Sequence, residues 1–306
     1  MAYIDLSLPR FIKKFSTEEA CLQAISEARW PRGFVCPKCG HSGGTRLSER
    51  RSMQCWSCRR QTSITSQTLF HGSHIPLVKW FLAIYLVAQD KGGISTKRLA
   101  KHLELHYATA WYLLYRIRFA MGQRDENLTL AGYIELDEAF FGGKRRNKRT
   151  RKGPKKPTEK KKTVFIMVES EGSQAGNLVM KVVKDATLDS LKPIVAQKVE
   201  ADPPGQMFRG DAWQAHDVVM QFGHTIKMSH IPNDQQDAEL PCMSLAITHA
   251  KRFLLGTCHQ FCKKHLQQYL DEFCYRWNRR HLERELASHL ISACALAPRM
   301  STLKAV

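Results

Sequence analysis

Four cysteines in two closely spaced pairs constrain the N-terminal part of this chain more than any other feature. They lie in "CPKCGHSGGTRLSERRSMQCWSC" and form the pairs Cys36–Cys39 and Cys55–Cys58. Each pair brings two thiolates near one ion, and four thiolates satisfy the tetrahedral coordination of Zn²⁺. The Gly-, Ser- and Arg-rich stretch between the pairs favours a turn and short strands, so the pattern predicts a zinc ribbon with structural Zn²⁺. Two redox motifs or two disulfides are the alternative interpretations of this spacing.

Whether the protein is secreted helps to decide between a zinc site and disulfides. The first residues, "MAYIDLSLPRFIKKFSTEEA", contain no apolar core followed by a small-residue cleavage site, so we expect no signal peptide. A disulfide framework is then unfavourable. The longest apolar run, "WFLAIYLVA", is too short to cross a bilayer. We therefore expect a cytoplasmic protein that is not associated with a membrane.

The net charge indicates a polyanionic partner. The chain has 306 residues, with 47 basic and 28 acidic side chains, and the run 144–162 holds 12 Lys or Arg and one Glu. Since the remainder is still basic, the excess is distributed, which favours nucleic acid. A solvated loop is the alternative interpretation of the run. Its first cations are the predicted DNA contacts Lys144, Arg145, Arg146, Lys148 and Arg149.

Helical patterns follow the cysteines. Ser16 and Glu19 have capping-box spacing and predict a short helix before the ribbon. Residues 71–128 contain an apolar helix and then two shorter helices that break near Leu105–His106, which is typical of helix-turn-helix DNA binding. His106 and Tyr107 would open the recognition helix, whereas Trp111 is expected in the core. Any three-helix bundle gives a similar pattern.

The remainder of the chain, residues 129–306, predicts an α/β domain. Strand-like runs occur at 133–142, 163–170 and 177–185, followed by a helix, a strand ending at Asp211, another short strand, and helices from about residue 245. This order is compatible with a ribonuclease-H-like sheet. The sequence therefore predicts a multidomain protein, with a helix and zinc ribbon in 1–70, a helix-turn-helix segment in 71–128 and an α/β ribonuclease-H-like domain in 129–306.

Two acids lie at predicted strand ends. Asp137 and Asp211 occupy the position where an α/β sheet presents ligands to a crevice. Two carboxylates that converge there would hold two Mg²⁺ ions for in-line phosphoryl displacement. Solvated acids or turn caps are the alternative for each residue alone. Glu135 shares the face of Asp137 and would be either buried or supporting.

Longer motifs carry a resemblance to a known family, the IS1595-family transposases with a zinc ribbon and an ISXO2-like domain. The resemblance covers nearly the whole chain. It rests on "FSTEEACLQAISEARWPRGFVCPKCG", "CWSCRRQTSITSQTLFHGSHIPLVKWF", "IELDEAFFGGKRR", "GDAWQAH", "HAKRFLLGT" and "KKHLQQYLDEFCYRWNRR". The family is similar to the DDE transposases, in which two Asp and a third residue bind metal ions.

The resemblance implies Asp137, Asp211, His249 and Lys251 as the catalytic set, with the first three as ligands of Mg²⁺ or Mn²⁺. Imidazole is a poorer ligand for Mg²⁺ than a carboxylate, and Mn²⁺ accepts it more readily. His249 would otherwise bind the scissile phosphate, and Lys251 would neutralise charge in the transition state.

The function that the resemblance implies is DNA transposition. The enzyme would bind the element's terminal inverted repeats, cleave phosphodiester bonds at the ends, and join the 3′-hydroxyl to target DNA. Double-stranded DNA would be its partner, in a homodimer or higher oligomer at the nucleoid. The alternatives are a non-catalytic DNA-binding protein derived from a transposase, in a repressor or bridging role, and a nuclease without strand transfer.

Overall fold

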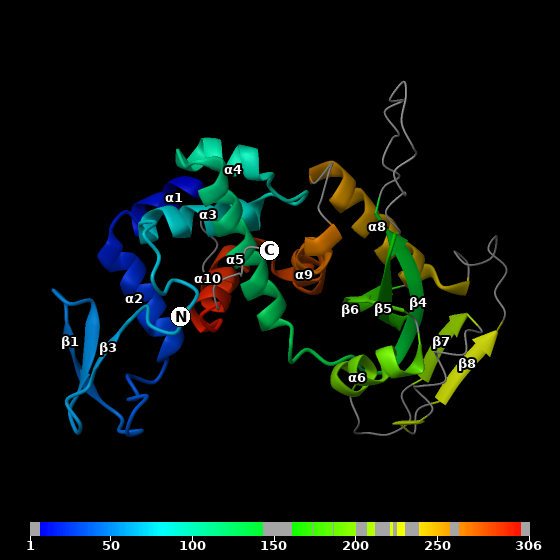
Figure 1. The fold of residues 1–306 in the computed structure, drawn as a ribbon, viewed down its shortest axis with the longest axis horizontal. Helices are drawn as coiled ribbons and strands as arrows, with labels where there is room; N and C mark the ends of the chain where they lie inside the picture. The colour runs from blue at the N-terminus through cyan, green and yellow to red at the C-terminus, as the bar shows by residue number, and fades with distance from the viewer. Residues whose placement is uncertain are drawn as a thin grey trace, which may run out of the picture. The chain divides into compact units, whose positions relative to one another are not determined.

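The computed structural model forms two compact units, residues 1–126 with 279–306 and residues 127–278 (Figure 1). Each unit is built around its own core. No helix among the described residues is long and apolar enough to cross a membrane. The structure describes residues 7–142, 161–172, 174–185, 187–199, 207–211, 221–222, 225–229, 239–257 and 263–300.

The first unit opens with two helices, α1 (Leu8–Lys14) and α2 (Glu18–Arg29). Thr17 caps α2, because its side chain accepts a hydrogen bond from the backbone N–H of Ala20 at 3.2 Å. The predicted helix is confirmed, but the predicted cap, Ser16, was one residue too early. The hydroxyl of Ser16 instead donates to the carbonyl of Lys13, at the end of the preceding helix.

A three-stranded antiparallel sheet follows, in the order β1-β2-β3. Its short strands fit a ribbon that holds few apolar side chains. The small cluster beneath it has Phe34, Cys36 and Cys55 at its centre, with Trp30 and Met53 packed against them. The strands are β1 (Gly44–Leu47), β2 (Ser52–Cys55) and β3 (Gln61–Ser63).

Three helices then complete the central part of this unit: α3 (Leu77–Gln89), α4 (Thr96–Leu103) and α5 (Tyr107–Arg124). The predicted break is confirmed, since three residues separate α4 from α5 and the first, Glu104, adopts the left-handed conformation. The side chain of Ser95 accepts from the N–H of Arg98 and caps α4. The local geometry is thus a helix, a short turn and a helix.

Trp111 is not in the core of this helical bundle, contrary to the prediction. Its side chain is half-buried and stacks on Tyr115, with ring centroids 5.2 Å apart. The buried stripe of α5 falls instead at Ala110, Leu113 and Leu114 and continues toward the C-terminal end of the helix. Trp111 follows Ala110 directly in the chain, so it lies at the edge of this buried stripe and not within it.

The second unit contains a five-stranded sheet in the order β6-β5-β4-β7-β8. Strands β4, β5 and β6 are consecutive and antiparallel, whereas β7 and β8 run parallel to β4. This order agrees with the expected ribonuclease-H-like sheet. The strands are β4 (Tyr133–Phe141), β5 (Lys162–Glu171), β6 (Gln174–Val183), β7 (Met207–Asp211) and β8 (Thr225–Ser229).

Helices cover the two faces of this sheet (Figure 1). The even-numbered residues Ile134 and Leu136 of β4 pack with α6 (Leu188–Lys198). The odd-numbered residues of β4, such as Ala139, pack with α8 (Pro241–Thr257) and α9 (Leu266–Asn278). A short 3-10 helix, η2 (Lys263–His265), precedes α9.

The chain returns to the first unit at residue 279, so the predicted third domain, 129–306, ends earlier in the structure. The returning segment contains the 3-10 helix η3 (Arg280–Glu285) and the helix α10 (Leu286–Leu296). Helix α10 contacts α2, α3 and α5. Its residues Leu290, Ile291 and Cys294 are fully buried there. An apolar C-terminal helix carries no local sign of which core it joins, and this explains the difference.

Candidate active site and metal centre

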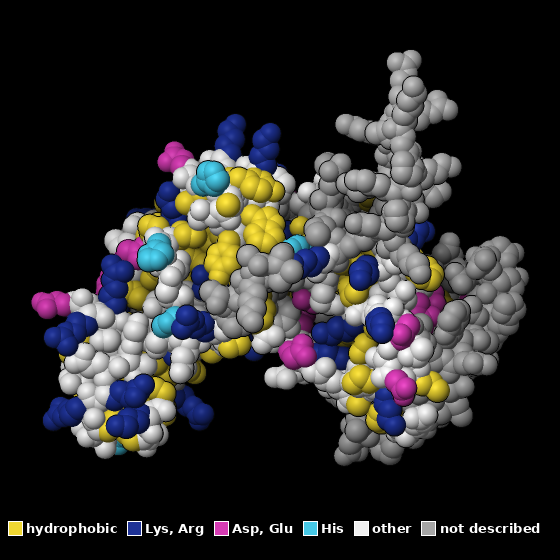
Figure 2. Space-filling view, in the orientation of Figure 1, with side chains coloured by type: hydrophobic (Ala, Val, Ile, Leu, Met, Phe, Trp, Pro, Cys, Tyr) yellow, Lys and Arg dark blue, Asp and Glu magenta, His cyan; other side chains and the backbone are white. Residues whose placement is uncertain are grey.

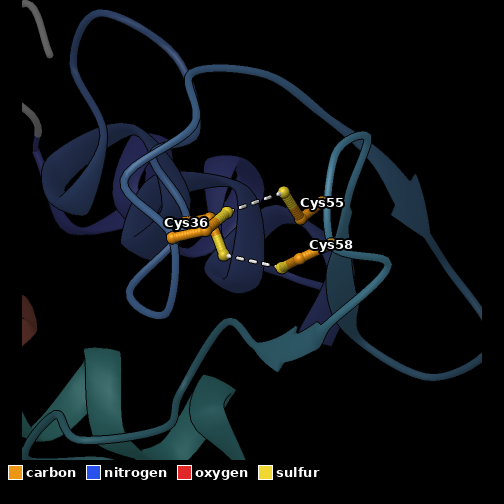
Figure 3. Close-up of side chains that lie close together, drawn as sticks. Cys36, Cys55 and Cys58 are labelled. Carbon is orange, nitrogen blue, oxygen red and sulfur yellow. Dashed lines mark hydrogen bonds between the residues drawn. The ribbon is translucent and has the colours of Figure 1, made fainter.

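The four predicted cysteine ligands converge at one point. The sulfur atoms of Cys36, Cys39, Cys55 and Cys58 lie within 4.8 Å of one another. The thiols of Cys55 and Cys58 point toward the loop that carries Cys36 (Figure 3). The Cys36–Cys58 and Cys39–Cys55 sulfur distances are 3.6 and 3.7 Å. Sulfurs that surround a tetrahedral Zn²⁺ at about 2.3 Å are roughly 3.8 Å apart, so the arrangement fits this ion.

The local backbone favours the thiolate form of Cys36, whereas the neighbouring thiols hold the pKa of Cys39 at about 11. Backbone N–H groups of Cys39 and then Lys38 donate to the sulfur of Cys36, and they lower the pKa of Cys36 to about 6. A thiolate is the form that binds the metal. Among the described residues, these four cysteines are the one group of three or more His, Cys, Asp or Glu side chains arranged to hold a metal ion.

Asp137 and Asp211 lie on adjacent parallel strands. Asp211 is the last residue of β7 as predicted, whereas Asp137 lies in the middle of β4 and not at its end, because the strand continues to Phe141. In the register between β4 and β7, Glu135 pairs with Arg209 and Leu136 pairs with Gly210. One further step brings Asp137 beside Asp211, at the usual separation of neighbouring strands, about 4.8 Å. Side chains at equivalent positions of neighbouring strands point to the same face. The side chain of Asp211 lies outside the described residues, and that of Asp137 is half-buried and accepts from the N–H of Glu138 at 2.8 Å.

Glu135, two residues before Asp137, is a buried carboxylate that the sequence left as either buried or supporting. Its side chain is 2% exposed and accepts from the backbone N–H of Met243 at 2.7 Å, in the first turn of α8. A carboxylate at a helix N-terminus satisfies a backbone donor and the positive end of the helix dipole. Burial raises the pKa of Glu135, while the Met243 N–H and the nearby Arg209 oppose that rise. Glu135 therefore fixes α8 on the sheet.

An ion pair lies next to this contact. Arg209, the neighbour of Glu135 on β7, pairs with Glu239, just before α8. Glu135, Arg209 and Glu239 thus form a brace that links β4, β7 and the start of α8. The sequence analysis did not identify Arg209 or Glu239. The sequence did contain a signal for Arg209. It precedes Asp211 by two residues, as Glu135 precedes Asp137, and residues two apart on a strand share a face.

His249 and Lys251 lie well inside α8 and not at a helix start. The helix begins at Pro241, four residues before the predicted position. Proline is favourable in the first helical turn, and the cap comes from Glu135 on a distant strand, so no local capping residue announced the start. Both His249 and Lys251 are exposed. The rings of His249 and of Trp277 on α9 pack in a T-shaped arrangement, with their centroids 5.9 Å apart.

The predicted DNA contacts divide into two groups. Lys144, Arg145, Arg146, Lys148 and Arg149 lie outside the described residues. His106 and Tyr107 are described and exposed, and Tyr107 is 56% accessible. The imidazole of His106 accepts from the N–H of Ala108 at 3.4 Å, so it caps α5. This local role leaves its Nε2 edge available at the start of the helix.

Two family models match the chain. The model of the ISXO2-like transposase domain matches residues 129–278, and the model of the transposase zinc-ribbon domain matches residues 16–61. The first match ends at the residue where the second structural unit ends. Together the two matches cover close to two-thirds of the chain. The second match includes the four converging cysteines.

Among curated proteins, the chain is similar to a protein in transposable element ISH50 of Halobacterium salinarum. The two are 28% identical over 132 residues, which is 42% of this chain and 44% of that relative. The chain thus aligns with less than half of the relative's length.

Solved structures give weaker matches. The Mos1 strand transfer complex is 11% identical, with 72% of this chain and 79% of that chain covered and a TM-score of 0.29. A simian T-cell lymphotropic virus intasome, solved with a PP2A regulatory subunit, is 12% identical, with 58% and 63% covered and a TM-score of 0.29.

Proposed function

Because this chain belongs to the IS1595 family of transposases, we propose that it binds the terminal inverted repeats of its element, cleaves the DNA there and joins the freed 3′-hydroxyl to target DNA. The observation that carries this proposal is the β4–β7 register, which supports Asp137 and Asp211 as neighbouring carboxylates. They lie within the residues that the transposase-domain model matches.

The residues of the α/β unit have separate roles in this reaction. Asp137 and Asp211 supply hard oxygen ligands, which fit Mg²⁺ or Mn²⁺. Two such ions supply activation of the attacking oxygen and stabilisation of the leaving oxygen. The Glu135 contact holds α8 over the face of β4 that carries Asp137. Lys251 neutralises negative charge that develops on the phosphate.

His249 takes the third position of the catalytic set. It lies on α8, the helix that packs against the same face of the sheet as Asp137. The imidazole either completes a metal site, for which Mn²⁺ is better suited than Mg²⁺, or donates a hydrogen bond to the scissile phosphate. In both cases replacement by alanine reduces cleavage.

DNA recognition belongs to the first unit in this proposal. The ribbon and the α4–turn–α5 segment hold the element ends, with His106 and Tyr107 at the start of the helix that enters the major groove. The basic run that includes Lys144 to Arg149 contacts phosphates. Both ends must be held together, so the active assembly is a homodimer or a higher oligomer, on DNA in the cytoplasm.

The test is cleavage of a supercoiled plasmid that carries the element's own ends. Wild type, Asp211→Ala, His249→Ala and His249→Glu are each assayed with Mg²⁺ and with Mn²⁺. We expect end-specific nicking by wild type that is lost in Asp211→Ala and in His249→Ala. Joined donor–target products separate strand transfer from simple hydrolysis, because a nuclease releases ends and does not join them.

The alternative is a non-catalytic DNA-binding protein derived from a transposase. The contact between His249 and Trp277 favours it, since it gives the imidazole a packing role that needs no metal. Wild type that binds the ends without cleaving them, with cleavage restored by His249→Glu, would establish this alternative. End-specific joining by wild type would exclude it.

A further inference from the structure

Five of the basic side chains of the ribbon fall into two sets with different surroundings. From Trp30 to Pro76 the chain carries seven Lys or Arg and one acid, Glu49. One set faces acids of α2: Arg46 pairs with Glu19 at 2.5 Å, and Arg51 pairs with Glu18 at 3.6 Å. These ion pairs hold the ribbon against its own helix and leave little charge for a partner.

The other set lies beside the metal centre. Lys38, Arg59 and Arg60 are exposed, and within the described part of the chain their side chains make no ion pair or hydrogen bond. Lys38 precedes Cys39, and Arg59 and Arg60 follow Cys58. Because the four sulfurs lie within 4.8 Å of one another, these three cations are anchored at the same end of the ribbon.

Trp56 projects from the same end and is held in a fixed position. Its side chain is 57% exposed, although its Nε1–H donates to the hydroxyl of Thr45 at 2.9 Å. The ring also lies against Gly43, so closely that a Cβ there would be 2.6 Å from Trp56 Cε3. One side of the indole is thus occupied by the ribbon itself. A large aromatic ring that is both ordered and exposed is available for contact with a partner at little entropic cost.

We define Lys38, Trp56, Arg59 and Arg60 as the knuckle face. Figure 2 shows Lys and Arg side chains gathered on the part of the surface that the ribbon forms. We propose that the knuckle face is a contact surface for the backbone of duplex DNA. The three cations contact phosphates, and the open side of Trp56 packs on a deoxyribose.

This inference rests on the proposed function, because transposition requires the element ends to be held. DNA is favoured over an acidic protein for two reasons. The whole chain has an excess of 19 positive charges, which suits a long polyanion. The cations also lie on a ribbon fixed by four cysteines, so they keep their relative positions. Fixed donors suit the phosphates of a duplex, because these phosphates are regularly spaced. The contact is with the backbone, so it fixes position and does not read sequence.

The experiment measures binding of the full-length, zinc-loaded protein to an element-end duplex and to a scrambled duplex by fluorescence anisotropy. The double variant Arg59→Gln/Arg60→Gln is compared with Arg10→Gln/Lys13→Gln. The control removes the same charge from exposed positions of α1. Zinc content and thermal unfolding are measured for every variant, so that loss of the ribbon fold is recognised.

We expect the knuckle double variant to weaken binding to both duplexes about tenfold, and equally, as loss of phosphate contacts does. The slope of log K against log salt should become shallower by about 1.8, because two phosphate contacts are lost and each contributes about 0.9. The α1 control should stay close to wild type in both measurements.

A second pair of variants tests the aromatic contact. Trp56→Ala should weaken binding roughly tenfold, within the range of aromatic stacking on nucleic acid, whereas Trp56→Phe should retain most of the affinity. Thr45→Val removes the hydrogen bond that fixes the ring and should give an intermediate loss. Because Thr45 acts through its hydrogen bond to the Trp56 ring, this variant reports the positioning of the ring.

The outcomes separate the inference from the proposed function. Wild type that binds no duplex overturns both. Wild type that binds the ends, with a knuckle double variant indistinguishable from the α1 control, overturns the inference alone. Knuckle variants that lose binding to polyglutamate but not to duplex would assign the face to an acidic protein and would also overturn it.

Discussion

At the scale of single residues, Glu135 connects the sheet to the helix that carries His249. Its carboxylate is buried, caps α8 through the N–H of Met243 and lies beside Arg209. Alternation along β4 predicted that Glu135 and Asp137 share a face, and the packing of Ala139 on that face agrees. Its partner on α8 was not predictable, because Met243 is 108 residues away and offers only a backbone group.

Glu135 gives a pH prediction. Burial raises its folded pKa above the ordinary value for glutamate, so its contribution to stability is fully present at low pH and is lost as pH rises toward the folded pKa. Glu135→Gln keeps an oxygen for the Met243 N–H and removes the ionisation. We expect the free energy of unfolding of the variant, relative to wild type, to increase with pH from about 4 upward.

Urea unfolding of both proteins at several pH values measures this difference. Glu138→Gln removes one charge from the opposite face of β4 and controls for net charge. A difference that stays constant with pH, or that falls as pH rises, would contradict the assigned sign.

Gly43 gives a second prediction at this scale. It combines a φ of +117° with close contact to the ring of Trp56. Alanine there meets both backbone strain and a steric overlap, so Gly43→Ala should destabilise the ribbon by about 1–3 kcal/mol. Gly72→Ala is the control, because Gly72 also has a positive φ but open space around its Cβ position. Zinc release during thermal unfolding reports the ribbon, and equal effects of the two variants would show that the overlap is harmless.

At the scale of elements, local signals predicted those elements whose ends are set locally. Ser95 caps α4, and the break before α5 falls where it was expected. Element ends were misplaced where tertiary contacts set them, as at α8, which starts at Pro241 under the cap from Glu135. The burial of Trp111 on α5 was also misjudged, because a helix with aromatic residues on two sides does not show from sequence alone which of them enter the core. For the candidate site, the sequence placed Asp211 correctly at the end of its strand, but it placed neither Asp137 along β4 nor His249 along α8 correctly.

The ribbon is the element for which metal removal has a clear outcome. Its apolar cluster centres on Phe34, Cys36 and Cys55, which is too small to fold three short strands without zinc. A chelator should therefore increase hydrogen exchange across β1, β2 and β3 and leave exchange across β4 and β5 unchanged. Hydrogen-exchange mass spectrometry measures both regions in one sample. Ribbon protection that survives complete zinc removal would contradict this prediction.

At the scale of the whole molecule, the α/β unit is inserted between two parts of the first unit. The chain leaves that unit after residue 126 and re-enters it at residue 279. Arg279 pairs with Asp125 at 2.7 Å, so the two ends of the interruption lie side by side within the first unit. Hydropathy alone does not show which core α10 joins. For this reason the predicted third domain, 129–306, wrongly included residues 279–306, which belong to the first unit.

Truncation tests this organisation. Residues 127–278 alone should fold, whereas 1–126 alone should expose the surface that Leu290, Ile291 and Cys294 cover. Burial of such side chains contributes about 1.5–3 kcal/mol each, a large part of a typical stability of about 5–15 kcal/mol. We expect 1–126 to aggregate, and a chain in which a short Gly/Ser linker joins 126 to 279 to be monodisperse by light scattering. A stable, monodisperse 1–126 would contradict the role of α10.

The insertion has a consequence for synthesis on the ribosome. All residues of the α/β unit are synthesised before α10, so the unit that carries the ribbon completes its core last, although its synthesis begins first. A chain that ends before α10 would therefore contain a complete α/β unit and an incomplete first unit. Messages cut short before codon 279 would yield products whose open apolar surface directs them to chaperones and proteases. Such fragments would not accumulate as competitors of the complete protein.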